Sequence, residues 1–142
     1  MTAAPTRADD AAWNHRRFFA LLGRLGPLRV IHQSGASTFE ALCTFGPHGF
    51  AQGYMNAITD AYHWHLKLDG FGHVRSRDRT HARSGRRVLF FELASDAGAK
   101  PFTSIYLHRA KGADFDPEVQ ALFARAHQTL ADGCVLEPEE TG

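Results

Sequence analysis

Alternation of side-chain type with a period of two is the sequence feature that most constrains the fold of this chain. In "HVRSRDRTHAR", residues 73–83, every odd position is His or Arg, and the positions between them carry Val, Ser, Asp, Thr and Ala. Successive side chains of a β-strand point to opposite faces, so this stretch predicts a strand with one cationic face. The stretch "AYHWHLKLDG" alternates in the same way, with His63, His65 and Lys67 on the polar face. Two half-buried strands are therefore expected in the middle of the chain.

Further short β-favouring runs lie on both sides of these segments. "PLRVIHQS" and "STFEALCTF" flank Ser34-Gly35, a dipeptide typical of a hairpin connection. "RVLFFEL" and "FTSIYLHR" are separated by the turn-rich "ASDAGAKP", while "GPHGFAQG" has the composition of a surface loop. Strands joined by short turns predict an antiparallel sheet.

One helix is expected near each end of the chain. Asp9 or Asp10 can cap the first, in which apolar residues recur at helical spacing until Gly23 or Gly26 ends it. The second covers "DPEVQALFARAHQTL", where Asp suits the N-cap and Pro the first helical position. The chain is therefore expected to have an α+β fold in which antiparallel β-sheet is flanked by an N-terminal and a C-terminal helix.

Length and composition favour one domain. A chain of 142 residues with 44% hydrophobic composition is large enough to bury one continuous core, so residues 1–142 are expected to form a single domain. Residues 1–8 and 134–142 are expected to be mobile. The sequence has no βαβ alternation and no glycine-rich phosphate-binding motif, which disfavours common kinds of nucleotide binding.

The sequence also favours a soluble, cytoplasmic protein. It has no apolar run near the roughly 18 residues that suggest a membrane-spanning helix, and no secretory signal. Cys43 and Cys134 lack zinc-module spacing and are expected to be reduced and structural.

Charge is segregated along the chain although the formal net charge is only +1. Residues 67–87 contain seven Lys/Arg and two acids, whereas residues 132–142 contain four acids and no Lys/Arg. This pattern favours a specific anionic partner for the central segment. Nucleic acid is a poor candidate, because the chain has neither a basic tail nor an RNA-recognition motif.

Three explanations suit the cationic face. It is a solvated strand surface, a phosphate-binding surface, or one wall of a site for a small carboxylated ligand. Haem fits the third explanation, because it has two propionates, a flat apolar macrocycle and an iron atom that accepts imidazole.

A metal enzyme is the alternative from the enzyme class. His63 and His65 have the H-x-H spacing of strand-borne metal sites, and with Asp69 after them they are similar to the first half of the cupin metal motif. Glu92 or His108 would complete a site for Fe, Zn or Mn. No hydrolase motif or activated nucleophile is present, and no catalytic residue is assigned.

From about residue 28 to residue 133 the chain resembles intracellular haem-utilisation carriers of the HutX/ChuX type, which are similar to half of the HemS/ChuS haem proteins. The resemblance rests on the order of "LRVIHQSGASTFEALCTF", a Gly-rich loop, "GHVRSRDRTHA", "RVLFFEL", "SIYLHR" and a closing helix. It implies a homodimeric HemS/ChuX-like fold. It also implies reversible binding of haem b in the cytoplasm and delivery to a haem-degrading or haem-receiving partner.

The resemblance also suggests the site. His32 in "VIHQS" and His73 in "GHVRS" match histidines that family members use for haem, so both are candidate iron ligands. The family's usual Gly-Tyr-Phe-Asn-Leu-Arg-like strand is replaced here by "AYHWHLKL". The predicted haem-binding set is His32, His63, His65, His73, Arg75, Arg77 and Arg83. A protein of the same fold that docks an acidic partner without binding haem remains a further alternative.

Overall fold

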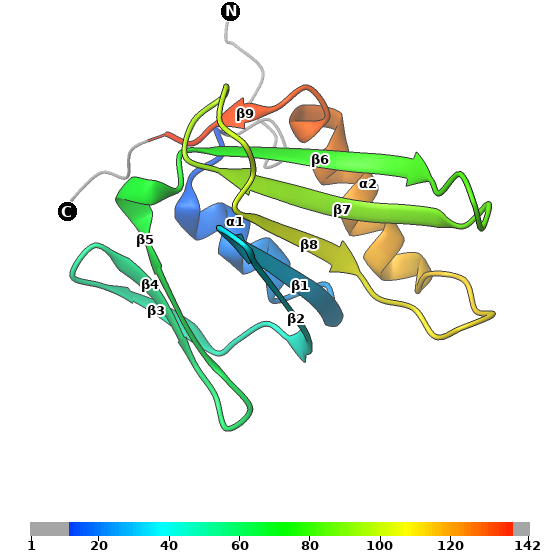
Figure 1. Ribbon diagram of the computed structural model, residues 1–142, viewed down its shortest axis with the longest axis horizontal. Coiled ribbons are helices and arrows are strands. Elements are labelled where there is room, and N and C mark those ends of the chain that lie inside the picture. The colour runs from blue at the N-terminus through cyan, green and yellow to red at the C-terminus, as the bar shows by residue number, and fades with distance from the viewer. Residues whose placement is uncertain (1–11, 138–142) are drawn as a thin grey trace, which may run out of the picture.

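The structure, a computed structural model, describes residues 12–137. Over that range the chain forms two α-helices and nine β-strands (Figure 1). The helices are α1 (His15–Leu22) and α2 (Pro117–Leu130). The strands are β1 (Pro27–Ser34), β2 (Ser37–Thr44), β3 (His48–Ala51), β4 (Tyr54–Ile58), β5 (His63–Lys67), β6 (His73–Thr80), β7 (Arg87–Ala94), β8 (Thr103–Leu107) and β9 (Cys134–Val135).

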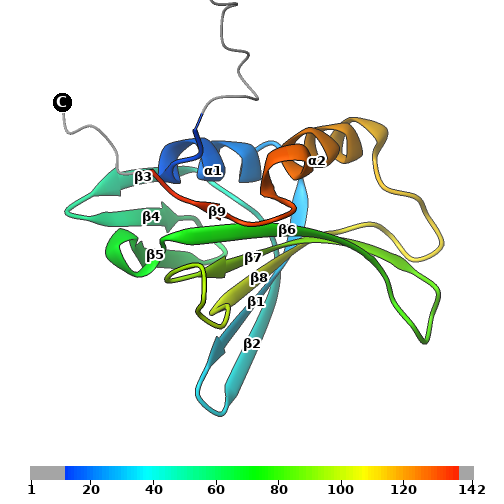
Figure 2. The ribbon, with the colours of Figure 1, turned by 90° about the horizontal axis from the view of Figure 1, so that it is seen from above.

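The strands form two antiparallel sheets. The larger sheet has the order β2-β1-β8-β7-β6-β9, and the smaller has the order β3-β4-β5. Both helices lie on one side of the larger sheet (Figure 2). The expected α+β architecture, with antiparallel sheet and a helix near each end, is confirmed.

The core lies between the helices and the larger sheet. Phe91 of β7 is fully buried, and its ring meets Phe18 of α1 at 5.5 Å and Phe123 of α2 at 5.1 Å between centroids. Phe19 of α1 connects this core to the smaller sheet through Trp64, at 6.0 Å. The side chains of Tyr62, Trp64, Leu66 and Leu68 pack against this core, as the alternation predicts.

Both helices begin at capping residues, because a side-chain oxygen there accepts hydrogen bonds from backbone N–H groups of the first turn, which have no partner within the helix. Asp116 accepts hydrogen bonds from the backbone N–H groups of Glu118 and Val119, and Pro117 follows it, as predicted. Asn14 caps α1 by accepting from the backbone N–H of Arg17. The predicted caps Asp9 and Asp10 lie outside the described residues.

Three segments differ from the sequence-based expectation. "GPHGFAQG" is not a loop, because residues 48–51 form β3, paired with β4. The cationic strand ends at Thr80, since residues 82–84 form a turn, so residues 81 and 83 do not share its face. The C-terminal acidic segment does not begin as a free tail, because β9 pairs with the first two residues of β6.

Neither helix in residues 12–137 combines the length and apolar character that crossing a membrane requires.

Candidate functional site

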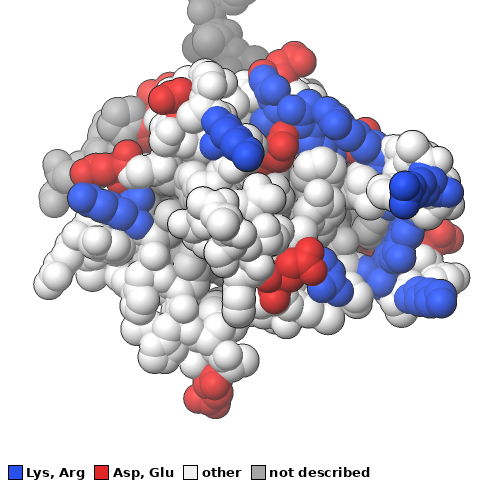
Figure 3. All heavy atoms as spheres, viewed as in Figure 1, with Lys and Arg blue, Asp and Glu red and all other residues white. Residues whose placement is uncertain are grey.

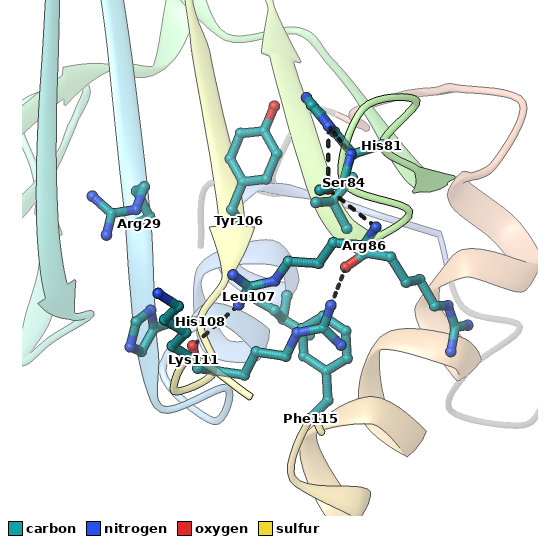
Figure 4. A pocket seen from close by; sticks show the side chains of 12 residues that line it. Arg29, His81, Ser84, Arg86, Tyr106, Leu107, His108, Lys111 and Phe115 are labelled. Atoms are coloured by element: carbon teal, nitrogen blue, oxygen red, sulfur yellow. Dashed lines mark hydrogen bonds between the residues drawn. The ribbon is translucent and has the colours of Figure 1, made fainter. Parts of the chain in front are cut away.

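A cationic hollow, called the basic pocket below, lies at the end of the larger sheet (Figure 4). It has a volume of about 500 Å³. Its lining residues are Arg29, His81, Ser84, Arg86, Arg87, Val88, Tyr106, Leu107, His108, Arg109, Lys111 and Phe115. Five of these are Lys or Arg and two are His, and no Asp or Glu is among the described residues that line it.

The basic pocket opens on the face of the larger sheet that the helices leave uncovered. Strand register places Arg29, Tyr106 and Phe90 side by side on β1, β8 and β7. Phe91, the residue after Phe90, faces the helices, so these three side chains point the other way. Phe90 and Tyr106 stack at 4.4 Å between centroids, which gives this face an aromatic surface.

The β6–β7 turn forms one side of the basic pocket. The turn closes through a hydrogen bond of 2.8 Å from the backbone N–H of Gly85 to the carbonyl of His81, and Gly85 has a φ of +67°. The hydroxyl of Ser84 lies 3.3 Å from Nδ1 of His81. Nδ1 of His81 also accepts a hydrogen bond from the backbone N–H of Ser84 at 3.4 Å, so both contacts hold the imidazole through that nitrogen.

Arg109 joins that turn to the opposite side of the basic pocket. Its guanidinium donates to the carbonyl of Arg87 at 2.6 Å and lies 4.1 Å from the centre of the Phe115 ring. Arg86 in turn donates to the carbonyl of Arg109 at 3.4 Å. The segment after β8 is therefore tied to the β6–β7 turn.

One of the cations is already neutralised. Arg87 donates to both carboxylate oxygens of Asp78, at 2.9 and 2.7 Å, and this hydrogen bonding holds the pKa of Asp78 below its usual value. Arg29 lies 3.9 Å from Glu40, at the limit of an ion pair. Figure 3 shows blue side chains gathered at the end of the molecule that carries the β6–β7 turn. An anion in the basic pocket would meet an excess of positive charge.

A second hollow, called the inter-sheet pocket below, lies between the two sheets on the helix-covered face. Its volume is about 250 Å³. Its lining residues are Val30, His32, Phe39, Ala41, Cys43, Tyr62, His63, Trp64 and Thr103. It brings the predicted residues His32 and His63 together from different sheets, but no Lys, Arg, Asp or Glu lines it among the described residues.

His65 belongs to neither hollow. His63 and His65 are exposed neighbours on β5, with ring centroids 6.2 Å apart, and Nδ1 of His65 lies 2.7 Å from Oδ1 of Asn56. Within residues 12–137 no cluster of three or more His, Cys, Asp or Glu could hold a metal ion. Glu92, a proposed third ligand, instead pairs with Arg77 on the larger sheet at 2.5 Å. The metal-enzyme interpretation is therefore not supported.

His73 and Arg75 form a third region, at the opposite end of the larger sheet. His73 is 7% exposed, and burial, followed by the charge of Arg75, lowers its pKa. Arg75 donates to the carbonyl of Asp132 at 3.2 Å. The small hollow that these two residues share with Arg77 has a volume of about 100 Å³.

The structure does not bring His32 and His73 together. Register aligns His32 with Thr103, Thr103 with Leu93, and Leu93 with Val74, the residue after His73. Aligned residues share a face, so His32 and His73 point to opposite faces of the larger sheet. Arg83 lies in the exposed β6–β7 turn, outside the lining of the basic pocket.

Sequence reasoning missed the basic pocket as a site. Its residues come from β1, from the β6–β7 turn and the start of β7, and from residues 106–115, which are far apart in the sequence. The sequence does show two clusters of cationic residues, "SGRR" at the start of β7 and "LHRAKG" at the end of β8. Only the pairing of these strands shows that the two clusters meet.

Comparison with known proteins identifies the fold. No family model matches the sequence, and no curated protein matches it significantly. The crystal structure of ChuX superposes with a TM-score of 0.69 over 81% of this chain and 71% of that chain, at 14% identity. The chain has the ChuX fold.

Other solved structures share the ChuX fold. Protein AGR_C_4470 from Agrobacterium tumefaciens gives a TM-score of 0.68 at 18% identity, over 81% of this chain and 66% of that chain. ChuS, described as an E. coli heme oxygenase, gives 0.65 at 17% identity, over 79% of this chain but only 33% of that chain. The present chain thus corresponds to about one third of ChuS and about two thirds of AGR_C_4470. At these identities the likeness establishes the fold alone.

Proposed function

We propose that this protein binds haem b reversibly in the basic pocket and carries it in the cytoplasm. ChuX is described as a heme-binding protein, as is PhuS from Pseudomonas aeruginosa, and both share the fold. The observation that carries the proposal is the lining of the basic pocket, where five Lys/Arg and two His surround about 500 Å³. A flat apolar dianion that contains iron matches that lining.

The residues of the basic pocket have distinct roles in this proposal. Arg86 and Lys111 pair with the propionates, since guanidinium and ammonium groups form charge-assisted hydrogen bonds with carboxylates. His81 or His108 approaches the iron, and the ring of Tyr106 lies against the macrocycle. No group is assigned a catalytic role, because the cargo is released unchanged.

The inter-sheet pocket and the His73 region suit haem less well. Their volumes are about 250 and 100 Å³, and drug-sized ligands occupy pockets of roughly 300 Å³ or more. In the part of the chain that the structure describes, no Lys or Arg lines the inter-sheet pocket to pair with a propionate. His32 and His73 are therefore the second choice as iron ligands. If His73 binds the iron, Arg75 and Arg77 would pair with the propionates.

Hemin titration of the apo-protein tests the proposal. A saturable Soret shift is expected for the wild type. The double variant His81→Ala/His108→Ala should bind at least about tenfold more weakly, because the iron loses both nearby imidazoles. The matched control His32→Ala/His63→Ala, which removes two imidazoles from the inter-sheet pocket, should titrate like the wild type.

Three results would contradict the proposal. If the control loses the Soret shift and the first double variant keeps it, the site is the inter-sheet pocket. Loss only in His73→Ala would place the iron at the far end of the sheet. If the wild type gives no shift and instead binds an acidic partner in a salt-sensitive manner, the protein is an interaction module of this fold.

We further propose that the protein passes haem to a receiving or degrading protein.

We also propose that the protein is a homodimer formed through the uncovered face of the larger sheet. This face carries Leu42, 50% exposed, beside the paired charges of Arg29 and Glu40. Sedimentation equilibrium should show a dimer that Leu42→Asp dissociates, because a second carboxylate on the face that carries Glu40 would lose its hydration in the interface. Ile58→Asp, on the smaller sheet and 56% exposed in the wild type, should remain dimeric. A monomeric wild type would contradict the proposal.

A further inference from the structure

We propose that the inter-sheet pocket is a second binding site, which takes a small, uncharged, ring-containing molecule. This inference goes beyond the proposed haem function, because it concerns another hollow on the opposite face of the larger sheet. Among residues 12–137, the two sites have no lining residue in common.

The lining of the inter-sheet pocket determines the class of ligand. Its walls combine aromatic rings from Phe39, Tyr62 and Trp64 with the small apolar side chains of Val30 and Ala41. Burial raises the pKa of the Cys43 thiol, which therefore stays uncharged near neutral pH. Because no acidic side chain, Lys or Arg lines the pocket among the described residues, a charged ligand would lose hydration without gaining an ion pair.

The walls of the inter-sheet pocket are held in place before any ligand binds. The Trp64 ring packs edge-on against Phe19 at 6.0 Å and Phe45 at 5.9 Å. The hydroxyl of Tyr62 donates to the carbonyl of Thr44 at 3.0 Å and accepts from the backbone N–H of Gly46 at 3.1 Å. A ligand would therefore enter a preformed space, which lowers the entropic cost of binding.

The exposure of the Phe39 side chain is a second, independent observation in favour of a bound ligand. This side chain is 68% exposed, the highest value among the large hydrophobic residues that the structure describes, and it lines the inter-sheet pocket. An exposed aromatic ring beside an apolar hollow is typical of a ligand-binding surface, because a bound ligand shields that ring from water.

The polar side chains of the inter-sheet pocket indicate which hydrogen-bonding group the ligand has. Nδ1 of His32 lies 3.1 Å from Oγ1 of Thr103, which leaves Nε2 as the second hydrogen-bonding atom of the ring. His63 stands on the other sheet. A ligand with one hydroxyl, amine or carbonyl group could therefore be oriented by an imidazole.

The test uses two fluorescent probes that share an aromatic skeleton and differ in charge. N-phenyl-1-naphthylamine is uncharged, whereas 1-anilinonaphthalene-8-sulfonate carries a sulfonate. The neutral probe should bind saturably at one site per chain, with energy transfer from tryptophan that falls in Trp64→Phe, because Trp64 lines the site. The sulfonate should bind this site at least about tenfold more weakly, because the site offers no cation.

Two variants on opposite faces of β2 locate the neutral probe. Ala41→Phe fills the inter-sheet pocket and should weaken binding at least about tenfold. Thr38→Phe adds a ring on the other face of the same strand and should bind like the wild type. Phe39→Ala removes the exposed ring and should also weaken binding. Circular dichroism of each variant checks that the fold is retained.

The outcomes separate this inference from the haem proposal. No saturable binding of the neutral probe, equal binding of the sulfonate, or unchanged binding in both Ala41→Phe and Phe39→Ala would overturn the inference. Hemin binding should be unaffected in folded Ala41→Phe. If that variant loses hemin as well as the neutral probe, the inter-sheet pocket is the haem site and this inference fails.

Discussion

Replacement of Phe91 by Ala is expected to lower the free energy of unfolding by about 3–5 kcal/mol. The Phe91 side chain is fully buried. Its ring contacts Phe18 of α1 and Phe123 of α2, at 5.5 and 5.1 Å between centroids. The cavity left by Ala would therefore lie where both helices meet the larger sheet, and neither helix could fill it without leaving its other contacts.

Urea unfolding followed by circular dichroism measures this loss. Phe39→Ala is the matched control, because it deletes the same side chain from a site that is 68% exposed. That control should change the free energy of unfolding by less than about 1 kcal/mol. Equal effects in the two variants would show that Phe91 does not join the helices to the sheet.

Gly133→Ala is expected to destabilise the protein by about 2–4 kcal/mol, from a backbone term and a steric term. Gly133 has a φ of +89°, a conformation that is unfavourable for a residue with a Cβ. A Cβ would also lie 2.6 Å from Nε2 of His73 and 3.1 Å from a terminal guanidinium nitrogen of Arg75. Because the imidazole of His73 is buried, the ring has little room to move away.

Gly112→Ala separates the two terms. Gly112 has a φ of +80°, but a Cβ there would meet no atom within 4 Å. This control should lose only about 1–2 kcal/mol, the cost of a left-handed conformation. Thermal and urea unfolding of both variants give the comparison. If Gly133→Ala is no more destabilising than Gly112→Ala, the imidazole of His73 does not restrict this position.

Much of the fold could be predicted because period-two alternation and capping residues act locally. The apolar face of "YHWHLKL" and the Asp116-Pro117 helix start both follow from rules that involve only neighbouring residues. β3 was missed because "GPHGFAQG" is rich in turn residues. It is a strand because β4 provides backbone partners, and a local pattern does not contain that information.

The candidate site was harder to predict for a related reason. Alternation shows which residues of one strand share a face, but the register between strands decides which faces coincide. His32 and His73 were both candidate iron ligands, yet the alignment through Thr103 and Leu93 places them on opposite faces. The basic pocket depends in addition on the β6–β7 turn meeting the segment after β8, which no single stretch of sequence encodes.

The strand β1 contributes to both pockets in alternate positions. Arg29 belongs to the basic pocket, whereas Val30 and His32 belong to the inter-sheet pocket. Alternate residues of this strand therefore belong to different sites, and each set is suited to a different class of ligand. Substitutions can change either site alone. Insertion of one residue at the start of β1 would instead move Arg29 into the place of Val30 in the uncharged pocket and Leu28 into the place of Arg29 in the cationic one, so that both sites would be lost together.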